Sequence, residues 1–357
     1  MSSELICHNP TYSIGTDLGH DLFDWFASNE HSSVFIIADE NTAKYCLPKI
    51  TVQNISFDAT RLFVIPAGEA SKSLEKCSEI WKFMLESGAD RKSVVICLGG
   101  GVVGDIGGFA ASTFMRGIRF IQIPTSLLAM VDSSIGGKTG IDFLDVKNTI
   151  GTFHQPEAIF CNLSFLDTLT AQERLSGFAE MVKHALIDGG DHWKLMKTVN
   201  PGDIKDWMPL VKKSVRLKYQ ITQDDFKEKG LREVLNLGHT TAHALEALYF
   251  EKGQALLHGF AVAAGLAIEA ELSSSISHGL SVEVKNEITN YIFSHFPKVH
   301  FSEDDIDRIV FFMGYDKKNR NGKRSFTLLR APGEPNLGEQ PSLEMIKKSL
   351  FFYFQHG

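Results

Sequence analysis

Hydrophobic positions in the first half of the chain form short runs separated by segments of helical spacing. Four of these runs are rich in β-branched residues and predict buried strands at 34–38, 62–65, 94–98 and 120–123. Residues 74–85, between the second and third runs, carry apolar side chains at helical spacing. Strands that alternate with helices in this way predict a parallel sheet with helices on its faces.

Beyond about residue 169 the pattern changes to long amphipathic stretches. Apolar side chains recur at helical spacing over 171–188, 211–221, 239–249, 260–273 and 282–293, and the apolar run 351–354 predicts the core packing of a final helix. The predicted fold class is therefore an α/β, Rossmann-like N-terminal domain with a parallel sheet (1–169), followed by an all-α C-terminal domain (170–357). We expect a ligand in a cleft between the two domains.

Composition narrows the class of protein. The 357 residues include 36 Lys and Arg against 43 Asp and Glu, a formal net charge of −7, and the sequence has neither a basic block nor an apolar run long enough to span a bilayer. We therefore expect no nucleic-acid or membrane partner. Five scattered cysteines without CxxC spacing argue against a disulfide framework, and the first residues do not resemble a signal peptide, so a cytoplasmic location is expected.

A glycine-rich loop follows the predicted strand that ends at Leu98. Consecutive glycines at 99–101 allow a backbone to approach a pyrophosphate, and the following helix start offers free N–H groups. A tight strand-to-helix turn remains the alternative, because the loop is not the dinucleotide GxGxxG in its usual place at the first strand. Asp39, at the end of an earlier strand, suits a ribose hydroxyl, and the loop at Glu69 also favours a nucleotide.

Several cations lie in other glycine-rich segments. The sequence around Lys138 resembles the end of a Walker loop, but Asp132 stands where that motif requires glycine, so an ATPase is rejected. Lys147 follows shortly and Arg116 lies in a glycine-flanked turn. Together these cations favour an anionic ligand, with solvated surface lysines as the alternative.

The second half contains a candidate metal site. Glu180 and Lys183 are three residues apart and share one helix face, His239 and His243 are four residues apart, and His258 begins an apolar helix. A carboxylate with two imidazoles is a common catalytic zinc set. Spacing alone favours His239 with His243, and it does not exclude His239 with His258.

A polar segment precedes His239 and contains Lys218. Arg232, Asn236, His239 and His243 recur at roughly one helical turn, so the pattern predicts that they line one wall. The planar guanidinium of Arg232 suits a carboxylate or a phosphate.

These segments resemble the 3-dehydroquinate synthase family of sugar-phosphate cyclases. The resemblance rests on GGGVVGDIGGF (99–109), FMRG (114–117), PTSLLAMVDSSIGGKTG (124–140), KN (147–148), SGFAEMVKHALI (176–187), LNLGHTTAHALE (235–246), HGFAVAAG (258–265) and DKKN (316–319). Departures are few: Ser126 replaces a commoner threonine and Ala242 a usual glycine. The resemblance implies a stand-alone enzyme rather than the fungal multifunctional fusion.

The resemblance implies an activity and its cofactors. We expect an NAD- and zinc- (or cobalt-) dependent lyase that converts 3-deoxy-D-arabino-heptulosonate 7-phosphate to 3-dehydroquinate and phosphate, in the shikimate pathway of aromatic amino acid and chorismate biosynthesis. Transient oxidation by NAD, phosphate elimination, reduction, ring opening and an intramolecular aldol would follow in turn. A small sugar-acid phosphate is the expected partner, and a homodimer the expected assembly.

The resemblance also implies site residues. Its metal ligands are Glu180, His239 and His258. Its catalytic and substrate-binding residues are Arg116, Lys138, Asn148, Lys183, Lys218, Arg232, Asn236, His243, Lys317 and Lys318. Its NAD-binding residues are Asp39, Asn41, Glu69, Lys72, Gly100, Gly101, Val102, Val103, Gly104, Asp105, Thr125, Ser126, Asp132, Lys138, Lys147, Phe165, Leu166, Asp167 and Thr168.

Three alternatives stay open. Another sugar-phosphate cyclase would lack the carboxylate grip that Lys218, Arg232 and Asn236 provide. A metal-dependent polyol-phosphate dehydrogenase of the same fold would release NADH. A non-catalytic binding protein would not need the full set of ligands, cofactor loop and cations.

Overall fold

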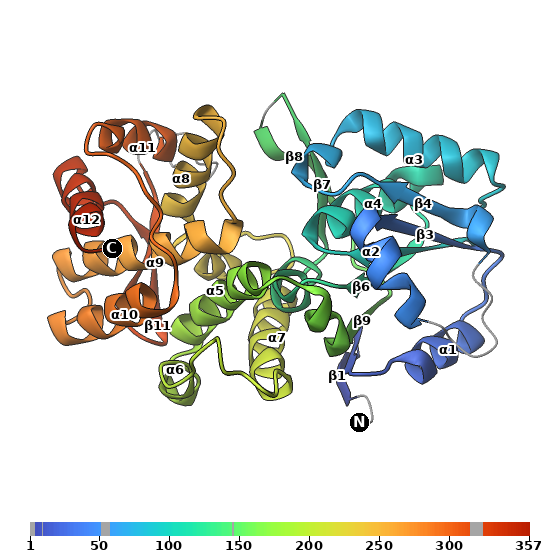
Figure 1. Cartoon of the computed structure of the whole chain (residues 1–357), viewed down its shortest axis with the longest axis horizontal. Coiled ribbons are helices and arrows are strands. Elements are labelled where there is room, and N and C mark those ends of the chain that lie inside the picture. The colour runs from blue at the N-terminus through green and yellow to red at the C-terminus, as the bar shows by residue number, and fades with distance from the viewer. Residues whose placement is uncertain (1–3, 9, 51–57, 145, 315–323) are drawn as a thin grey trace. The chain divides into compact units, whose positions relative to one another are not determined.

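The computed structural model describes residues 4–8, 10–50, 58–144, 146–314 and 324–357 (Figure 1). The chain divides into two compact units. The first unit comprises Met1–Arg174 and Trp207–Lys227, and the second comprises Leu175–Asp206 and Glu228–Gly357. Residues 207–227, which lie beyond the predicted boundary at 169/170, therefore pack with the first unit. The assignment of NAD binding to 1–169 and of metal binding to 170–357 stays a prediction.

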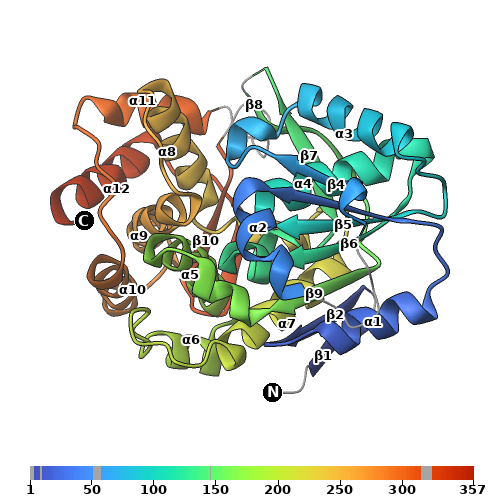
Figure 2. The ribbon, with the colours of Figure 1, turned by 45° about the vertical axis from the view of Figure 1, so that its right-hand side comes forward.

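A seven-stranded sheet forms the centre of the first unit (Figure 2). Its strand order is β1-β2-β9-β6-β5-β3-β4, and every neighbouring pair is parallel except β1 with β2. The strands are β1 (Glu4–His8), β2 (Thr11–Gly15), β3 (Val34–Asp39), β4 (Leu62–Ile65), β5 (Val94–Gly99), β6 (Arg119–Pro124) and β9 (Ala158–Asn162). The four strands predicted from β-branched runs are confirmed, and the sheet is mostly parallel as expected.

Helices and shorter turns connect these strands. The helices of the first unit are α1 (Gly19–Ser28), α2 (Glu40–Tyr45), α3 (Leu74–Glu86), α4 (Gly101–Thr113) and α7 (Met208–Asp224). A separate hairpin joins β7 (Lys138–Phe143) to β8 (Val146–Phe153). A hydrophobic cluster between sheet and helices includes Phe35, Val95, Ile80 and Phe109, all buried. Each such side chain contributes roughly 1.5–3 kcal/mol by leaving water.

Helix α4 lies unusually close to the sheet. A Cβ atom added at Gly104 would be 2.7 Å from the side-chain oxygen of Gln122, and one at Gly107 would be 2.7 Å from the sulfur of Cys97. Real Cβ atoms do not approach neighbours so closely, so larger residues here would push the helix away. The close packing fixes the N-terminus of α4 directly beyond the end of β5.

The second unit is helical, with one small sheet. Its helices are α5 (Ala171–Asp188, which enters the unit at Leu175), α6 (Gly190–Met196), α8 (His239–Glu251), α9 (His258–Ser275), α10 (Val282–His295), α11 (Asp305–Met313) and α12 (Leu343–His356). Helix α9 is buried over most of its length and packs against α8, α10 and α12. A helix that is apolar all round belongs at such a centre.

The prediction of an all-α second domain is wrong in one detail. Strands β10 (Phe326–Ala331) and β11 (Glu334–Glu339) form an antiparallel hairpin in the second unit. Strand β11 has the sequence EPNLGE, which lacks alternating apolar residues, so hydrophobic patterning gave no signal for it. The helix predicted around residues 351–354 is present as α12.

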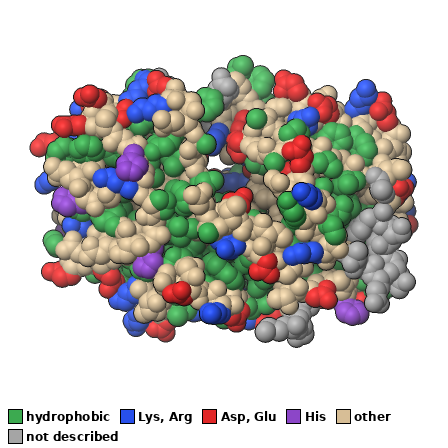
Figure 3. Space-filling view, in the orientation of Figure 1, with side chains coloured by type: hydrophobic (Ala, Val, Ile, Leu, Met, Phe, Trp, Pro, Cys, Tyr) green, Lys and Arg blue, Asp and Glu red, His purple; other side chains and the backbone are tan. Residues whose placement is uncertain are grey.

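Surface charge follows the composition. On the face seen in Figure 3, acidic and basic side chains are interspersed on each unit. Among the described residues, no helix is both long enough and apolar enough to cross a membrane.

Candidate active site

The strand order of the first unit creates a switch point between β3 and β5. From β3 the chain continues outward to β4, then returns to the other side of β3 as β5 and continues to β6. Crossovers in open parallel sheets diverge at such a point, and ligands bind there beyond the carboxyl ends of the strands. Asp39 ends β3, and the glycines at 99–101 follow β5.

The glycine loop is shaped for a close backbone approach. Gly100 is the N-cap residue of α4, and a Cβ atom there would lie 3.3 Å from the hydroxyl of Ser126. A Cβ atom at Gly101 would lie 3.3 Å from the hydroxyl of Ser133. The N–H of Thr125 donates to the carbonyl of Gly99 at 3.0 Å, which ties this loop to the end of β6. The exposed N–H groups of a helix start suit a pyrophosphate, so the loop fits a dinucleotide.

A buried ion pair joins the segment that follows β4 to the beginning of α4. The ammonium of Lys72, only 4% exposed, is 2.7 Å from the carboxylate of Asp105 on α4 and 3.8 Å from that of Glu69. Burial raises the pKa of Asp105, and the charge of Lys72 opposes this increase. Burial lowers the pKa of Lys72, but the charges of Asp105 and Glu69 raise it above its usual value. Fully buried lysines are rare without a charged partner, so the pair is built into the fold.

A second pair joins Asp132 to Lys218. Asp132 lies in a single π-helical turn, Ala129–Ser133, and its carboxylate is 2.5 Å from the ammonium of Lys218 on α7. The buried hydroxyl of Tyr12 donates to the carbonyl of Met130 in the same turn at 2.7 Å. Single π-turns occur often at functional sites, because they re-aim side chains within a helix.

Other predicted residues of the first unit are exposed or lie in turns. The side chains of Arg116, Lys138, Lys147 and Asn148 are exposed. Arg116 (φ 74°) and Asn148 (φ 52°) have left-handed backbone conformations, which non-glycine residues adopt at a cost of roughly 1–3 kcal/mol. Such strain is concentrated at functional sites.

The remaining predicted NAD residues lie at the ends of strands. The carboxylate of Asp39 accepts from the N–H of Thr42 at 2.8 Å and so caps α2, while Asn41 is exposed in the first turn of that helix. The 3-10 helix Leu163–Thr168 directly follows β9 and contains Phe165, Leu166, Asp167 and Thr168. Val102, Val103 and Gly104 occupy the first turns of α4.

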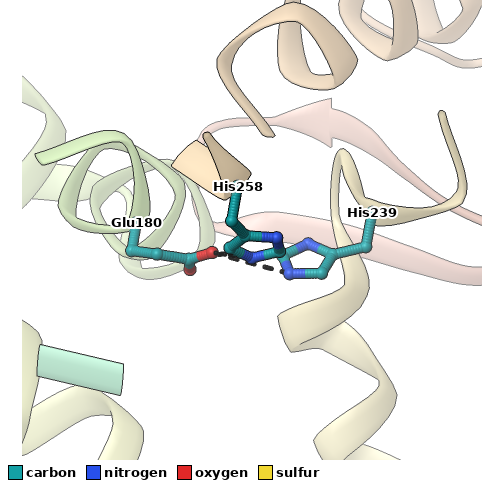
Figure 4. A group of neighbouring side chains, drawn as sticks. All are labelled: Glu180, His239 and His258. Atoms are coloured by element: carbon teal, nitrogen blue, oxygen red, sulfur yellow. Dashed lines mark ion pairs between the residues drawn. The ribbon is translucent and has the colours of Figure 1, made fainter. Parts of the chain in front are cut away.

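The second unit brings one carboxylate and two imidazoles together (Figure 4). Glu180, which is fully buried on α5, points between His239, the first residue of α8, and His258, the first residue of α9. Its Oε1 atom is 3.5 Å from Nε2 of His239 and 3.4 Å from Nε2 of His258. One ligand atom from each of the three lies within 4.8 Å of the others. A Glu-His-His donor set of this size fits zinc with open positions for substrate.

Electrostatics distinguish the two imidazoles. Burial and the nearby charge of Lys183 lower the pKa of His239 well below its usual value, so its ring is neutral, as a metal ligand must be. Burial opposes protonation of His258 as well, but Glu180 and Glu246 together raise its pKa to about 10, so a metal that binds this ring would displace a proton from it. Nδ1 of His258 is 3.5 Å from the carboxylate of Glu246. Sequence reasoning missed Glu246, although its place two turns after His239 on α8 was a usable signal.

The second unit also contains buried cations, one of which contacts this group. Lys183 (1% exposed) forms an ion pair with Glu180, and Arg232 is 2% exposed. The amide nitrogen of Asn236 is buried without a hydrogen-bond partner among the described residues. The burial of Lys183 and Arg232 shows that neither is a solvated surface cation. The alternative of solvated surface lysines concerned Arg116, Lys138 and Lys147, and their exposure leaves it open.

The continuous helical spacing from which one wall was predicted for Arg232, Asn236, His239 and His243 is wrong, and the shared wall itself stays a prediction. Arg232 and Asn236 lie in a 3-10 helix, Leu231–Asn236, and α8 begins only after Gly238, whose φ is +79°. Left-handed backbone there interrupts the helical spacing that the sequence suggested. His243 is exposed, and its ring centre lies 5.4 Å from that of His239.

Of the predicted residues, the structure brings together Glu180, His239 and His258, and it pairs Lys72 with Asp105 and Asp132 with Lys218. Glu180, His239 and His258 agree with the ligand set that the resemblance implies, and the assignment of each role stays a prediction. Lys317 and Lys318 lie outside the described residues.

Solved structures define the class of fold. 2-Epi-5-epi-valiolone synthase from Streptomyces hygroscopicus, with NAD+ and Zn2+ bound, matches with a TM-score of 0.84 at 23% identity, covering 97% of each chain. 2-Deoxy-scyllo-inosose synthase, complexed with carbaglucose-6-phosphate, NAD+ and Co2+, matches with a TM-score of 0.81 at 20% identity, covering 97% of this chain and 98% of that one. The chain therefore has the dehydroquinate synthase-like fold.

Sequence comparison identifies the family within that class. Residues 62–176 match the model for the N-terminal part of 3-dehydroquinate synthase, and residues 177–319 match the model for its C-terminal part. A 3-dehydroquinate synthase from Parabacteroides distasonis is 39% identical over 340 residues, covering 94% of this chain and 96% of that protein. The chain belongs to the 3-dehydroquinate synthase family, which is a family of enzymes.

Proposed function

We propose that the protein is a 3-dehydroquinate synthase, which converts 3-deoxy-D-arabino-heptulosonate 7-phosphate to 3-dehydroquinate and phosphate in the shikimate pathway. The observation that carries this proposal is the group of Glu180, His239 and His258, with the buried cation of Lys183 paired to Glu180. A carboxylate with two imidazoles suits a metal that binds hydroxyl groups, and buried cations suit a substrate that carries several negative charges. Family membership supports the same reaction.

NAD and zinc or cobalt are the proposed cofactors. The glycine loop, the switch point and the start of α4 would hold the NAD pyrophosphate, and Glu180, His239 and His258 would hold the metal. Solved structures of the same fold contain NAD+ with Zn2+ or Co2+. When bound, the two cofactors supply reversible hydride transfer and acidification of the hydroxyl group to be oxidised.

The protein's own residues bind and orient the substrate. Arg232 presents a buried planar fork, and we assign it with Lys218 to the substrate carboxylate. Arg116, Lys138, Asn148 and His243 are assigned to the phosphate end. These four side chains are exposed, which suits them to a phosphate group that must be released into solvent.

Lys183 and Asn236 are assigned to substrate hydroxyls. The ammonium group of Lys183 forms an ion pair with Glu180, and the buried amide nitrogen of Asn236 offers a donor that a substrate oxygen would satisfy. Holding the flexible sugar acid in one reactive conformation is then the main task of the protein. The assignment of NAD residues at 39–168 is part of the same proposal.

Assembly and location complete the proposal. We infer a homodimer that acts in the cytoplasm on a small sugar-acid phosphate. The buried, reduced state of all five cysteines is compatible with a reducing compartment. Sedimentation of the purified protein near 80 kDa, about twice the monomer mass of 39.6 kDa, would support the dimer, and sedimentation at the monomer mass would contradict it.

One coupled assay tests the reaction. Enzyme is mixed with the heptulosonate 7-phosphate, a trace of NAD and zinc, and phosphate is measured while the NADH absorbance is followed. Phosphate in large excess over the NAD present, without lasting NADH, supports the proposed cyclase. Accumulation of NADH without phosphate indicates a dehydrogenase of this fold instead. The matched control is His258→Ala, which should release phosphate no faster than buffer.

If neither product forms, the substrate assignment is refuted. Phosphate release from a sugar phosphate without a carboxylate would then point to another cyclase. In that case Arg232→Met would leave the rate with the alternative substrate nearly unchanged.

A further inference from the structure

The two histidines of the metal group share an unusual position. His239 is the first residue of α8 and His258 is the first residue of α9. The first turn of a helix has N–H groups without intrahelical partners, and a side chain at the N-cap position usually satisfies one of them. Neither helix has such a cap: the N-cap residues are Gly238 and Leu257. The first turns of both helices, which carry the two imidazoles, therefore depend on hydrogen bonds from other parts of the chain.

Glu269 supplies that support for α8. This carboxylate is fully buried on α9, and it accepts from the N–H of Gly238 at 2.7 Å and from the N–H of Thr241 at 3.1 Å. Those two groups are the N-cap and N3 donors, which a capping box normally satisfies with two side chains of the helix itself. Here a single carboxylate from a neighbouring helix replaces both.

The backbone at Gly238 explains why the cap must come from elsewhere. Its φ of +79° strains any other residue, and a Cβ atom there would lie 3.0 Å from the side chain of Leu266. A Cβ atom at Gly265 would lie only 2.0 Å from the carbonyl of Gly238. The two helices thus touch backbone to backbone. Glu269 follows Gly265 by one helical turn and so points at the start of α8.

Helix α9 receives the same kind of support from α5. The hydroxyl of Ser176 accepts from the N–H of Gly259 at 3.0 Å, and Ser176 is itself buried. Ser176 precedes Glu180 by one helical turn on α5. Each helix that begins with a histidine of the metal group is therefore capped by a side chain from another helix that carries a member of the same group.

We propose that Glu269 is a positioning residue of the metal centre, with Ser176 in the same role at α9. Glu269 fixes the first turn of α8 and thereby the imidazole of His239, so that metal affinity depends on a carboxylate that does not touch the metal. This inference rests on the proposed metal centre. Partners that orient metal ligands typically change affinity by about 10–100-fold when mutated.

The test compares two substitutions of the same kind on the same helix. Glu269→Gln keeps the shape of the side chain but replaces one acceptor oxygen with a donor, which would face a backbone N–H. Glu271→Gln is the matched control, because Glu271 on the same helix pairs with Lys285 of α10 at 3.0 Å. Zinc affinity is measured by competition with a chromophoric chelator, and the visible spectrum of Co2+ reports the ligand geometry.

We expect Glu269→Gln to bind zinc at least 10-fold more weakly and to change the Co2+ spectrum. Glu271→Gln should bind within twofold of the unsubstituted protein, and NAD affinity should be unchanged in both. Equal zinc affinity of the two variants would overturn the inference. If the unsubstituted protein binds no zinc, the proposed metal centre itself is refuted.

A second variant keeps the test decisive if Glu269→Gln does not fold. Ser176→Ala removes one neutral hydrogen bond and is expected to weaken zinc binding about threefold or more. Its control is Ser274→Ala on α9, where the hydroxyl donates within its own helix. Zinc affinity that is the same in both serine variants would overturn the inference.

Discussion

The buried ion pair between Lys72 and Asp105 makes a quantitative prediction about stability. Lys72→Met keeps the length and apolar stem of the side chain but leaves the Asp105 carboxylate without its partner at 2.7 Å. Removal of one member of a buried pair costs about 3–5 kcal/mol. Asp105 is 20% exposed, so water can screen part of its charge, and we take the lower end, about 3 kcal/mol.

The expected effect is a lower unfolding temperature of the first unit. At about 2–4 °C per kcal/mol for a unit of roughly 200 residues, the midpoint should fall by about 6–12 °C. The control is Lys76→Met, because Lys76 forms an exposed pair with Glu79 at 2.6 Å that is worth at most about 1 kcal/mol. Both variants are compared by calorimetry without NAD.

The penalty should also depend on pH. Burial raises the pKa of Asp105, and removal of Lys72 removes the main opposing influence. A carboxyl group whose folded pKa exceeds its unfolded pKa loses stability as pH rises through the folded value. Destabilisation by Lys72→Met should therefore be larger at pH 8 than at pH 5. Equal midpoints for the two lysine variants, or a penalty that grows toward acid pH, would refute the reasoning.

Three further outcomes are expected. His258→Ala should lose bound metal, whereas His243→Ala should retain it and lose rate; metal analysis with the opposite pattern would overturn the ligand assignment. Tyr12→Phe should cost about 1–2 kcal/mol in urea unfolding, because the buried carbonyl of Met130 loses its donor, and no change would show that water replaces the hydroxyl. Gly265→Ala places a Cβ atom 2.0 Å from the carbonyl of Gly238 at the start of α8. Ordinary overpacking lowers the free energy of unfolding by about 1–3 kcal/mol, and this contact should reach or exceed the upper end, about 3 kcal/mol. A stable variant would mean that the two helices can separate.

Hydrophobic pattern predicted the elements that the core itself requires. Strands β3, β5 and β6 are central and buried, so their apolar runs are long enough to recognise, and the long helices of the second unit have clear periodicity. Strand β9 was missed although all five of its residues are buried, because its sequence AIFCN contains a single β-branched residue, whereas the recognised runs are rich in them. Hairpin β7–β8 was missed because β8 is largely exposed, and its sequence VKNTIGTF has no regular alternation of apolar and polar residues.

The site was predictable as residue types but not as geometry. Spacing placed His239 and His243 together, since both lie on α8, while His258 comes from a different helix that only tertiary packing brings near. The family resemblance supplied His258. Neither source indicated Glu269, because a buried carboxylate in an apolar helix gives no sign of the backbone it serves until the neighbouring helix start is seen.

The contact between Gly238 and Gly265 has a consequence for protein engineering. Side-chain packing usually sets the spacing of helices, so core substitutions shift any site that the helices carry. Here the carbonyl of Gly238 lies against the α-carbon of Gly265, and this main-chain contact, with the carboxylate of Glu269, sets the approach of α8 to α9. The apolar positions on the remaining faces of α9 are thus open to redesign for thermostability, while the spacing of the two histidines stays as the backbone defines it.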